Sequence, residues 1–313
     1  MIPLSIWIHM HIHSGFRILN KKSTLFLVLP LFLMHFAKSA QAQFFSLGSR
    51  SAAMGGAAST QVDLWALNNN VGALGFLDRA AAGLYYENRF VLPETGTYGL
   101  HIAYPFQKLG SFGLSLSRFG YRQFSRNSVG IRYAKNFGPK VSAGIGMNYH
   151  YLFIGNGYGN ASAFSAELGI LGKVNEELSL AFHLVNPVRM RITAYQNQRL
   201  PMIIRFGLAY NWVKKVVTAL EIDAYPDQKP TLKLGIEYRP VELFQIRAGF
   251  TGMPLSGSFG FGFKYKPVWI DFSAVYHQQL GFSPQASLCF SFGKLRKIPS
   301  PLPRKKQKNP NRK

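Results

Sequence analysis

The sequence predicts an all-β protein, a transmembrane antiparallel β-barrel of about 14 strands preceded by a short N-terminal segment. Two observations support this prediction. First, between residues 80 and 292 the chain repeats segments of about ten residues that alternate apolar and polar side chains and are separated by turn residues. Second, the apolar positions are rich in Phe, Tyr, Leu and Ile, whereas the others carry Gly, Ser and charged side chains. A barrel in lipid needs such strands, because its outer wall must be apolar and its lumen can hold water.

The alternation is clearest near the C-terminal end of this region. In residues 231–239, Leu232, Leu234, Ile236 and Tyr238 alternate with Lys233, Gly235, Glu237 and Arg239. Successive side chains of a strand point to opposite faces, so the two sets lie on opposite sides of one strand. Residues 244–250 and 258–265 repeat the pattern. We therefore expect one lipid-facing and one lumen-facing side on each strand.

An N-terminal segment, residues 1–42, is predicted to be a signal peptide. Arg17, Lys21 and Lys22 precede the apolar residues 23–36, and Ala40-Gln41-Ala42 follow as a small-residue cleavage site. A retained membrane helix is the alternative, but the apolar run is short and contains Pro30. The prediction is export by way of a cleaved signal peptide to the cell outer membrane.

After the signal peptide we expect three regions: an N-terminal segment without strand alternation over 43–79, which the resemblance described below makes a plug, the barrel over 80–292 and a basic disordered tail over 293–313. The expected strands are 80–91, 97–106, 110–119, 127–136, 140–153, 161–173, 177–185, 201–211, 214–225, 231–239, 243–251, 256–265, 268–277 and 284–292. Clusters of Pro, Gly and Asn separate them. An even number of strands places both ends of the barrel region on the periplasmic side.

The formal net charge of +23 is concentrated at the ends of the chain. The tail contains nine basic residues and no acidic ones: Lys294, Arg296, Lys297, Arg304, Lys305, Lys306, Lys308, Arg312 and Lys313. A nucleic-acid partner is disfavoured, because the signal peptide takes the chain out of the cytosol. We expect a solvated tail that contacts anionic lipid headgroups or the cell wall.

The parity of the strands also predicts which charges face the lumen. The candidate lumen charges are Arg205, Glu221, Lys233, Glu237, Arg247 and Asp271. The signs are mixed on neighbouring strands, so we expect ion pairs, such as Glu221 and Glu237 with Lys233 and Arg247. A selectivity ring would need charges of one sign at one height, and the sequence does not show such a ring.

The segment before the first strand contains several short motifs. Residues 51–57 read SAAMGGA, Asp63 follows, and residues 65–75 read WALNNNVGALG. These motifs resemble the N-terminal signature of FadL-like outer-membrane families, especially the PorV/PorQ group, in which an A-M-G-G-A element precedes an acidic residue and an N-P-A-G-L-like element. Residues 205–208 (RFGL), 235–238 (GIEY) and 246–250 (IRAGF) also resemble that group.

The resemblance implies a plug folded into the lumen. Its candidate residues are Met54, Gly55, Gly56, Asp63, Trp65, Asn69 and Asn70. The glycine pair would allow close approach of the backbone. For Trp65, packing within the plug is favoured over contact with a ligand.

Two functions follow from the resemblance. FadL-like barrels conduct hydrophobic molecules, whereas PorV/PorQ-like relatives serve type IX secretion and the surface attachment of secreted proteins. The closer motif likeness and the lack of an apolar stripe in the lumen favour a secretion accessory, whose partners are secretion-machinery or cargo proteins besides outer-membrane lipid. The alternative is a passive channel whose partners are hydrophobic small molecules.

No catalytic, cofactor-binding or metal-binding residues are expected. Ser142, Asn148 and His150 share one face of a strand, but Ser142 and Asn148 stand about 20 Å apart along it, too far for a catalytic triad. The Gly-rich patches lack the strand-to-helix context of a phosphate loop. The lumen-facing glycines are instead interpreted as room for a plug.

Overall fold

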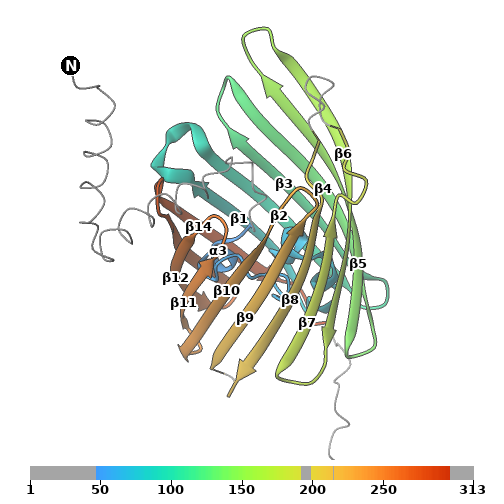
Figure 1. Ribbon diagram of the computed structural model, residues 1–313. Helices are drawn as coiled ribbons and strands as arrows, with labels where there is room; N and C mark the ends of the chain where they lie inside the picture. The colour runs from blue at the N-terminus through green and yellow to red at the C-terminus, as the bar shows by residue number, and fades with distance from the viewer. Residues whose placement is uncertain (1–46, 192–198, 214, 297–313) are drawn as a thin grey trace, which may run out of the picture. The chain divides into compact units, whose positions relative to one another are not determined.

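Fourteen antiparallel strands close into a barrel in the computed structural model, which describes residues 47–191, 199–213 and 215–296 (Figure 1). Each strand pairs with its neighbour in sequence, and β1 pairs with β14 to close the cylinder, with Ala80 opposite Phe292. The fold class and the strand number predicted from the alternation are therefore confirmed. Closure matters in lipid because it leaves no edge strand with unpaired backbone groups.

The strand boundaries agree with the predicted ones to within a few residues. The strands are β1 (Ala80–Asn88), β2 (Gly96–Phe106), β3 (Gly110–Gly120), β4 (Phe124–Phe137), β5 (Val141–Ile154), β6 (Gly159–Lys173), β7 (Leu178–Val185), β8 (Ile203–Trp212), β9 (Val216–Tyr225), β10 (Gln228–Val241), β11 (Phe244–Thr251), β12 (Ser256–Tyr265), β13 (Val268–His277) and β14 (Gly281–Phe292).

Strand β10 is longer than the sequence predicted, because Pro230 and Pro240 lie inside it instead of in the flanking turns. The register with β9 shifts between Gln228 and Thr231, and the register with β11 shifts between Tyr238 and Val241. Such irregularities accommodate a proline, which has no N–H to donate to a ladder. The strand therefore continues past both prolines.

The two faces of each strand differ as predicted. On β10 the outward side chains of Leu232 and Ile236 are 42% and 46% exposed, whereas the inward side chains of Lys233 and Glu237 are 7% and 1% exposed. Outward apolar side chains of this kind surround the barrel, so its wall suits a hydrocarbon surrounding.

The longest connections lie at one end of the barrel. One spans residues 89–95, with the short helices η2 (Arg89–Val91) and η3 (Pro93–Thr95), and another spans residues 186–202. At the opposite end the hairpins are short, and the chain enters β1 and leaves β14 there. Outer-membrane barrels have short periplasmic turns and longer extracellular loops, so we name the two ends accordingly.

The described residues before β1 lie within the barrel and form three short helices: α3 (Ser49–Ala53), α4 (Ala66–Asn69) and η1 (Val71–Phe76). Their side chains are almost all buried, and Leu64, Leu67 and Leu74 pack against Ala81 and Ala103 of the wall. We call residues 47–79 the plug. In the described part of the chain, no helix has the length and apolar character needed to cross a membrane. The predicted signal peptide and residues 297–313 of the predicted tail lie outside the described residues.

Candidate functional site

The plug contacts the wall around the whole barrel, and glycines form its seat. A Cβ atom on any of these inward glycines would lie closer than 3.0 Å to a plug atom: Gly83 (β1), Gly113 (β3), Gly144 (β5), Gly169 (β6), Gly207 (β8), Gly235 (β10), Gly249 (β11) and Gly260 (β12). The missing side chains let the plug approach the wall backbone directly. Of the Gly-rich patches interpreted as room for a plug, residues 144–146 and 260–262 each contribute one such glycine, whereas a Cβ on Gly155, Gly157 or Gly159 would have no plug atom among its nearest neighbours.

The closest backbone approach is at Met54, Gly55 and Gly56. The Gly55 N–H donates to Ser258 Oγ at 3.0 Å, and Thr251 Oγ1 donates to the Gly55 carbonyl at 2.8 Å. The φ angles of Gly55 and Gly56 are 65° and 75°, in the left-handed region that favours glycine. A Cβ on Gly55 would lie 2.6 Å from the Leu234 carbonyl oxygen. The motif therefore places a turn of the plug directly on β10, β11 and β12.

A second group of contacts holds the plug at residues 58 and 59. The Glu221 carboxylate accepts from the N–H groups of Ala58 and Ser59 at 3.1 and 2.8 Å. Lys233 Nζ pairs with the same carboxylate at 2.9 Å and with Asp223 at 2.7 Å, as predicted for Glu221 and Lys233. Arg205 lies 3.4 Å from Asp223 and donates to the Asn69 carbonyl at 3.4 Å. The charges of β8, β9 and β10 therefore bind plug backbone.

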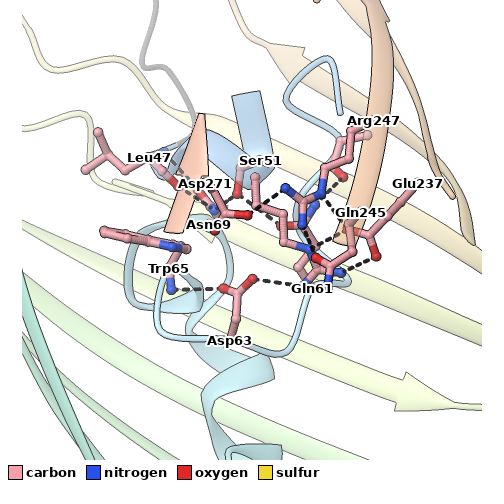
Figure 2. Close-up of polar contacts among 12 residues, drawn as sticks. Leu47, Ser51, Gln61, Asp63, Trp65, Asn69, Glu237, Gln245, Arg247 and Asp271 are labelled. Atoms are coloured by element: carbon pink, nitrogen blue, oxygen red, sulfur yellow. Dashed lines mark hydrogen bonds and ion pairs between the residues drawn. The ribbon is translucent and has the colours of Figure 1, made fainter. Parts of the chain in front are cut away.

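The strongest charged contact between plug and wall is made by Arg50 of α3. Its Nε lies 2.9 Å from Glu237 Oε2 and its Nη1 lies 3.0 Å from Asp63 Oδ2. Arg247 pairs with Glu237 and Asp271 at 2.6 Å each. Figure 2 shows Asp63, Glu237, Arg247 and Asp271 gathered between the plug and the wall. We call Arg50, Asp63, Glu237, Arg247 and Asp271 the latch cluster.

The side chains of the latch cluster are largely buried, and each of them pairs with a side chain of opposite charge. The Arg50 side chain is 16% exposed, and those of Glu237 and Arg247 are 1% exposed. Burial by itself lowers the pKa of the Arg50 guanidinium, but Glu237 and Asp63 outweigh burial and hold this pKa above its usual value. Removing one partner of such a group leaves a buried charge uncompensated, which is strongly destabilising.

The remaining predicted plug residues stabilise the plug itself. Asp63 Oδ1 accepts from the Trp65 N–H at 2.9 Å. Trp65 is 2% exposed, and its ring lies 5.1 Å from that of His101 and 5.9 Å from that of Tyr85. Trp65 therefore packs against Tyr85 of β1 and His101 of β2.

The two asparagines bind plug backbone. Asn69 donates to the Leu47 carbonyl at 3.0 Å and accepts from the Leu47 N–H at 3.1 Å. Asn70 donates to the Ser59 carbonyl at 2.8 Å and to Ile170 of β6 at 3.1 Å, and it accepts from the Gly72 N–H at 2.9 Å. Asn70 thus starts η1 and ties it to the wall.

Sequence reasoning missed three arginines that bind the plug. Arg50 precedes the recognised motif and lies on no strand, so strand parity says nothing about it. Arg132 has lumen parity, but only the structure shows its Nε donating to the Leu67 carbonyl at 2.6 Å and its Nη2 pairing with Glu167 at 2.8 Å. Arg296 was assigned to the tail, yet it is 5% exposed.

Arg296 fastens the segment after β14 across the periplasmic mouth. Its guanidinium donates to the Gly75 carbonyl of the plug at 3.2 Å, to Ser111 of β3 at 3.1 Å and to Asn136 of β4 at 2.6 Å. Its backbone N–H donates to the Asp78 carbonyl at 2.7 Å. The predicted tail therefore starts with residues that contact the plug and the wall.

Replacing Arg296 with alanine is expected to release this segment. The loss of three side-chain hydrogen bonds removes about 1.5 to 3 kcal/mol. Trypsin should then cleave after Lys294 roughly 10- to 150-fold faster than in the unmodified chain. Lys266→Ala, an exposed change in a turn at the same end, should leave that cleavage rate unchanged. Equal rates for both variants would contradict the assignment.

The polar groups on the wall near the plug form hydrogen bonds with the plug and with one another. The Ser142 hydroxyl donates to the Gly72 carbonyl at 2.7 Å, and Asn148 bonds to Arg132 at 2.7 Å and to Glu167 at 3.1 Å. His150 bonds to Ser128 and Ser165. Ser142 and His150 therefore do not form a nucleophile–base pair. Among the described residues, no group of three or more His, Cys, Asp and Glu side chains is placed to hold a metal ion.

The single cysteine of the chain gives a natural test of the plug's seating. Cys289 faces inward on β14, is 8% exposed and packs in the cluster that contains Leu64, Leu67, Leu74 and Leu77 of the plug. We expect a polar maleimide to label Cys289 slowly in the folded protein in detergent and rapidly after unfolding. Mass spectrometry measures the labelled fraction. Rapid labelling of the folded protein would contradict the packing described above.

No protein-family model matches the chain, and no curated protein matches it. Solved structures do match. They include the monoaromatic hydrocarbon channel CymD (TM-score 0.63, 13% identity, 80% of this chain and 98% of that chain). They also include the toluene transporter TbuX of Ralstonia pickettii (TM-score 0.59, 13% identity, 80% and 99%) and a FadL homologue of Pseudomonas aeruginosa (TM-score 0.52, 12% identity, 80% and 97%). The chain therefore shares the fold of FadL-like outer-membrane channels.

Proposed function

We propose that this chain is a non-enzymatic outer-membrane barrel through which hydrophobic small molecules pass passively. The observation that carries the proposal is a closed barrel whose bore is filled by a plug held without covalent bonds, in a fold shared with proteins described as hydrocarbon and toluene channels.

The geometry suits controlled passage better than a permanently open pore. The glycine seats bring plug backbone or side-chain atoms against the wall on eight strands, so the bore is filled at that level. A solute can cross this level only when the plug shifts. The latch cluster and the Glu221 contacts set the free energy that such a shift requires.

The proposal includes the organisation predicted from the sequence. Residues 1–42 direct export, residues 43–79 form the plug, residues 80–292 span the outer membrane and residues 293–313 extend into the periplasm. The apolar outer wall and the short hairpins at the end where β1 begins support this placement.

A second candidate is an accessory role in type IX secretion or surface attachment, in the manner of the PorV/PorQ group. The motifs of residues 51–75 favour it. The filled bore also favours it, because a barrel that conducts nothing can still bind other proteins at its ends. In this case the extracellular connections 89–95 and 186–202 would contact secreted proteins. The solved channels favour the first candidate over this one.

One deletion strain separates the two candidates. Deleting the gene and supplying it again on a plasmid allows two measurements in the same cells: uptake of radiolabelled toluene and processing of secreted proteins. The channel predicts reduced toluene uptake that the plasmid restores, with normal processing and normal uptake of a hydrophilic sugar as the control. Normal toluene uptake with impaired processing would replace the channel with the secretion role.

A further inference from the structure

The outer wall carries an apolar hollow of about 860 Å³ that is separate from the plug site. It crosses six neighbouring strands, from β13 through β14, β1, β2 and β3 to β4. Residues that lie opposite one another on neighbouring strands form one row across it: Ile270, Leu288, Leu84, Leu100, Leu116 and Val129. Six strands spaced about 4.8 Å apart make this row about 24 Å long, enough for one extended acyl chain.

The hollow is built into the fold. Several inward residues of the same strands are small, including Gly83, Gly99, Ser115 and Ser287, so the wall can lie close to the plug at these positions. A Cβ on Gly83 would lie 2.7 Å from the Leu64 side chain. The plug thus supports the hollow from behind.

One end of the hollow is polar. The next row towards the extracellular end contains Tyr86 and Tyr98, whose rings lie 5.1 Å apart, and then Arg118 and Asn127. Tyr rings at this height are typical of the membrane interface. Arg118 and Asn127 both line the hollow, and the described residues that line it include no acidic one.

Arg118 is unusual for its position. Arg118 on β3 and Lys135 on β4 are charged residues with outward parity, whereas charged strand residues such as Arg132 and Glu167 are buried and face inward. Lys135 lies near the periplasmic end of β4, outside the hollow, whereas Arg118 lies two residues from the extracellular end of β3. A lipid-facing arginine is costly at the bilayer midplane and tolerated near the interface, where it can meet a phosphate.

We propose that the hollow binds one phosphate-bearing lipid of the extracellular leaflet. An acyl chain lies along the row of Leu84, Leu100 and Leu116, and the phosphate accepts hydrogen bonds from the Arg118 guanidinium and the Asn127 amide. Arginine suits a phosphate because its planar fork donates two parallel hydrogen bonds. The proposal rests on the outer-membrane placement proposed above and is independent of solute passage.

Native mass spectrometry of the full mature chain, stripped of lipid in detergent, tests the proposal. Phosphatidylglycerol, a diacylglycerol with the same acyl chains, and inorganic phosphate are each added. We expect one phosphatidylglycerol to be retained, and neither diacylglycerol nor inorganic phosphate. Arg118→Ala should weaken phosphatidylglycerol retention about tenfold, whereas Lys135→Ala should leave it unchanged.

A second variant controls for the apolar half of the site. Leu100→Trp fills the hollow while leaving Arg118 in place, and it should also reduce retention. The heat-dependent gel shift of barrel proteins confirms that each variant is folded. Equal retention of diacylglycerol, retention of inorganic phosphate alone, or unchanged binding by Arg118→Ala would overturn the proposal. Toluene uptake is not part of this readout, so failure of the channel proposal would leave the result unaffected.

Discussion

Replacing Arg50 with alanine is expected to unseat the plug. Arg50 is the latch-cluster residue that joins the plug to the wall, because it pairs with Asp63 on one side and Glu237 on the other. Without it, Asp63 and Glu237 lose a buried cation, and the seated state should lose about 3 kcal/mol. This value is at the low end for buried pairs, because Glu237 keeps Arg247 and Arg239 as partners.

Cys289 reports the change. If a polar maleimide reaches Cys289 through the unseated state, about 3 kcal/mol corresponds to labelling that is roughly 100-fold faster. In planar bilayers the same variant should show ion conductance where the unmodified protein shows almost none.

The matched control is Arg239→Ala. Arg239 pairs with the same Glu237 carboxylate at 2.5 Å, but its side chain is 38% exposed and it belongs to the wall. Exposed ion pairs contribute about 0 to 1 kcal/mol, so labelling of Cys289 should change less than tenfold. Equal effects of the two variants would show that Arg50 has no special part in seating the plug.

Replacing Gly249 with valine is expected to exclude the plug from its seat on β11. A Cβ there would lie closer than 3.0 Å to backbone atoms of Met54 and Gly55, which cannot move aside as a flexible side chain can. Valine itself suits a strand, so the barrel should still form. Overpacking of this kind costs about 1 to 3 kcal/mol or more, and the cost falls on the contact between plug and wall.

Two measurements check this result. Labelling of Cys289 should accelerate, and the heat-dependent gel shift should show that the barrel remains closed. Gly257→Val on β12 is the control, because a Cβ at Gly257 has nothing within 4 Å. If Gly249→Val labelled as slowly as Gly257→Val, the plug would not depend on direct backbone contact with β11.

The sequence predicted the barrel well because the membrane imposes a strict rule on strands. Each strand must alternate between lipid and lumen, so parity alone placed Lys233 and Glu237 inward and Leu232 and Ile236 outward. Parity also placed many glycines of the strands inward, but it did not distinguish those that seat the plug, such as Gly260, from those that face wall side chains, such as Gly262.

The plug contacts could not be predicted in the same way. Residues 47–79 have no period that fixes which side chain faces the wall, so the partners of Arg50 and the backbone hydrogen bonds of Glu221 depend on tertiary packing. Arg132 had the right parity, but its main partner is a plug carbonyl that no sequence pattern marks. The apolar hollow is lined by residues of six neighbouring strands, and the alternation of side chains along each strand does not indicate where the wall is hollowed.

The position of Arg296 has a consequence for biogenesis. Its partners belong to three segments that are far apart along the chain: the plug at Gly75, β3 at Ser111 and β4 at Asn136. The complete set of hydrogen bonds needs the plug inside the barrel, because the Gly75 carbonyl belongs to the plug. We therefore expect the plug to enter the barrel before Arg296 forms its hydrogen bonds. In a barrel that closed without the plug, Arg296 would lack its Gly75 acceptor.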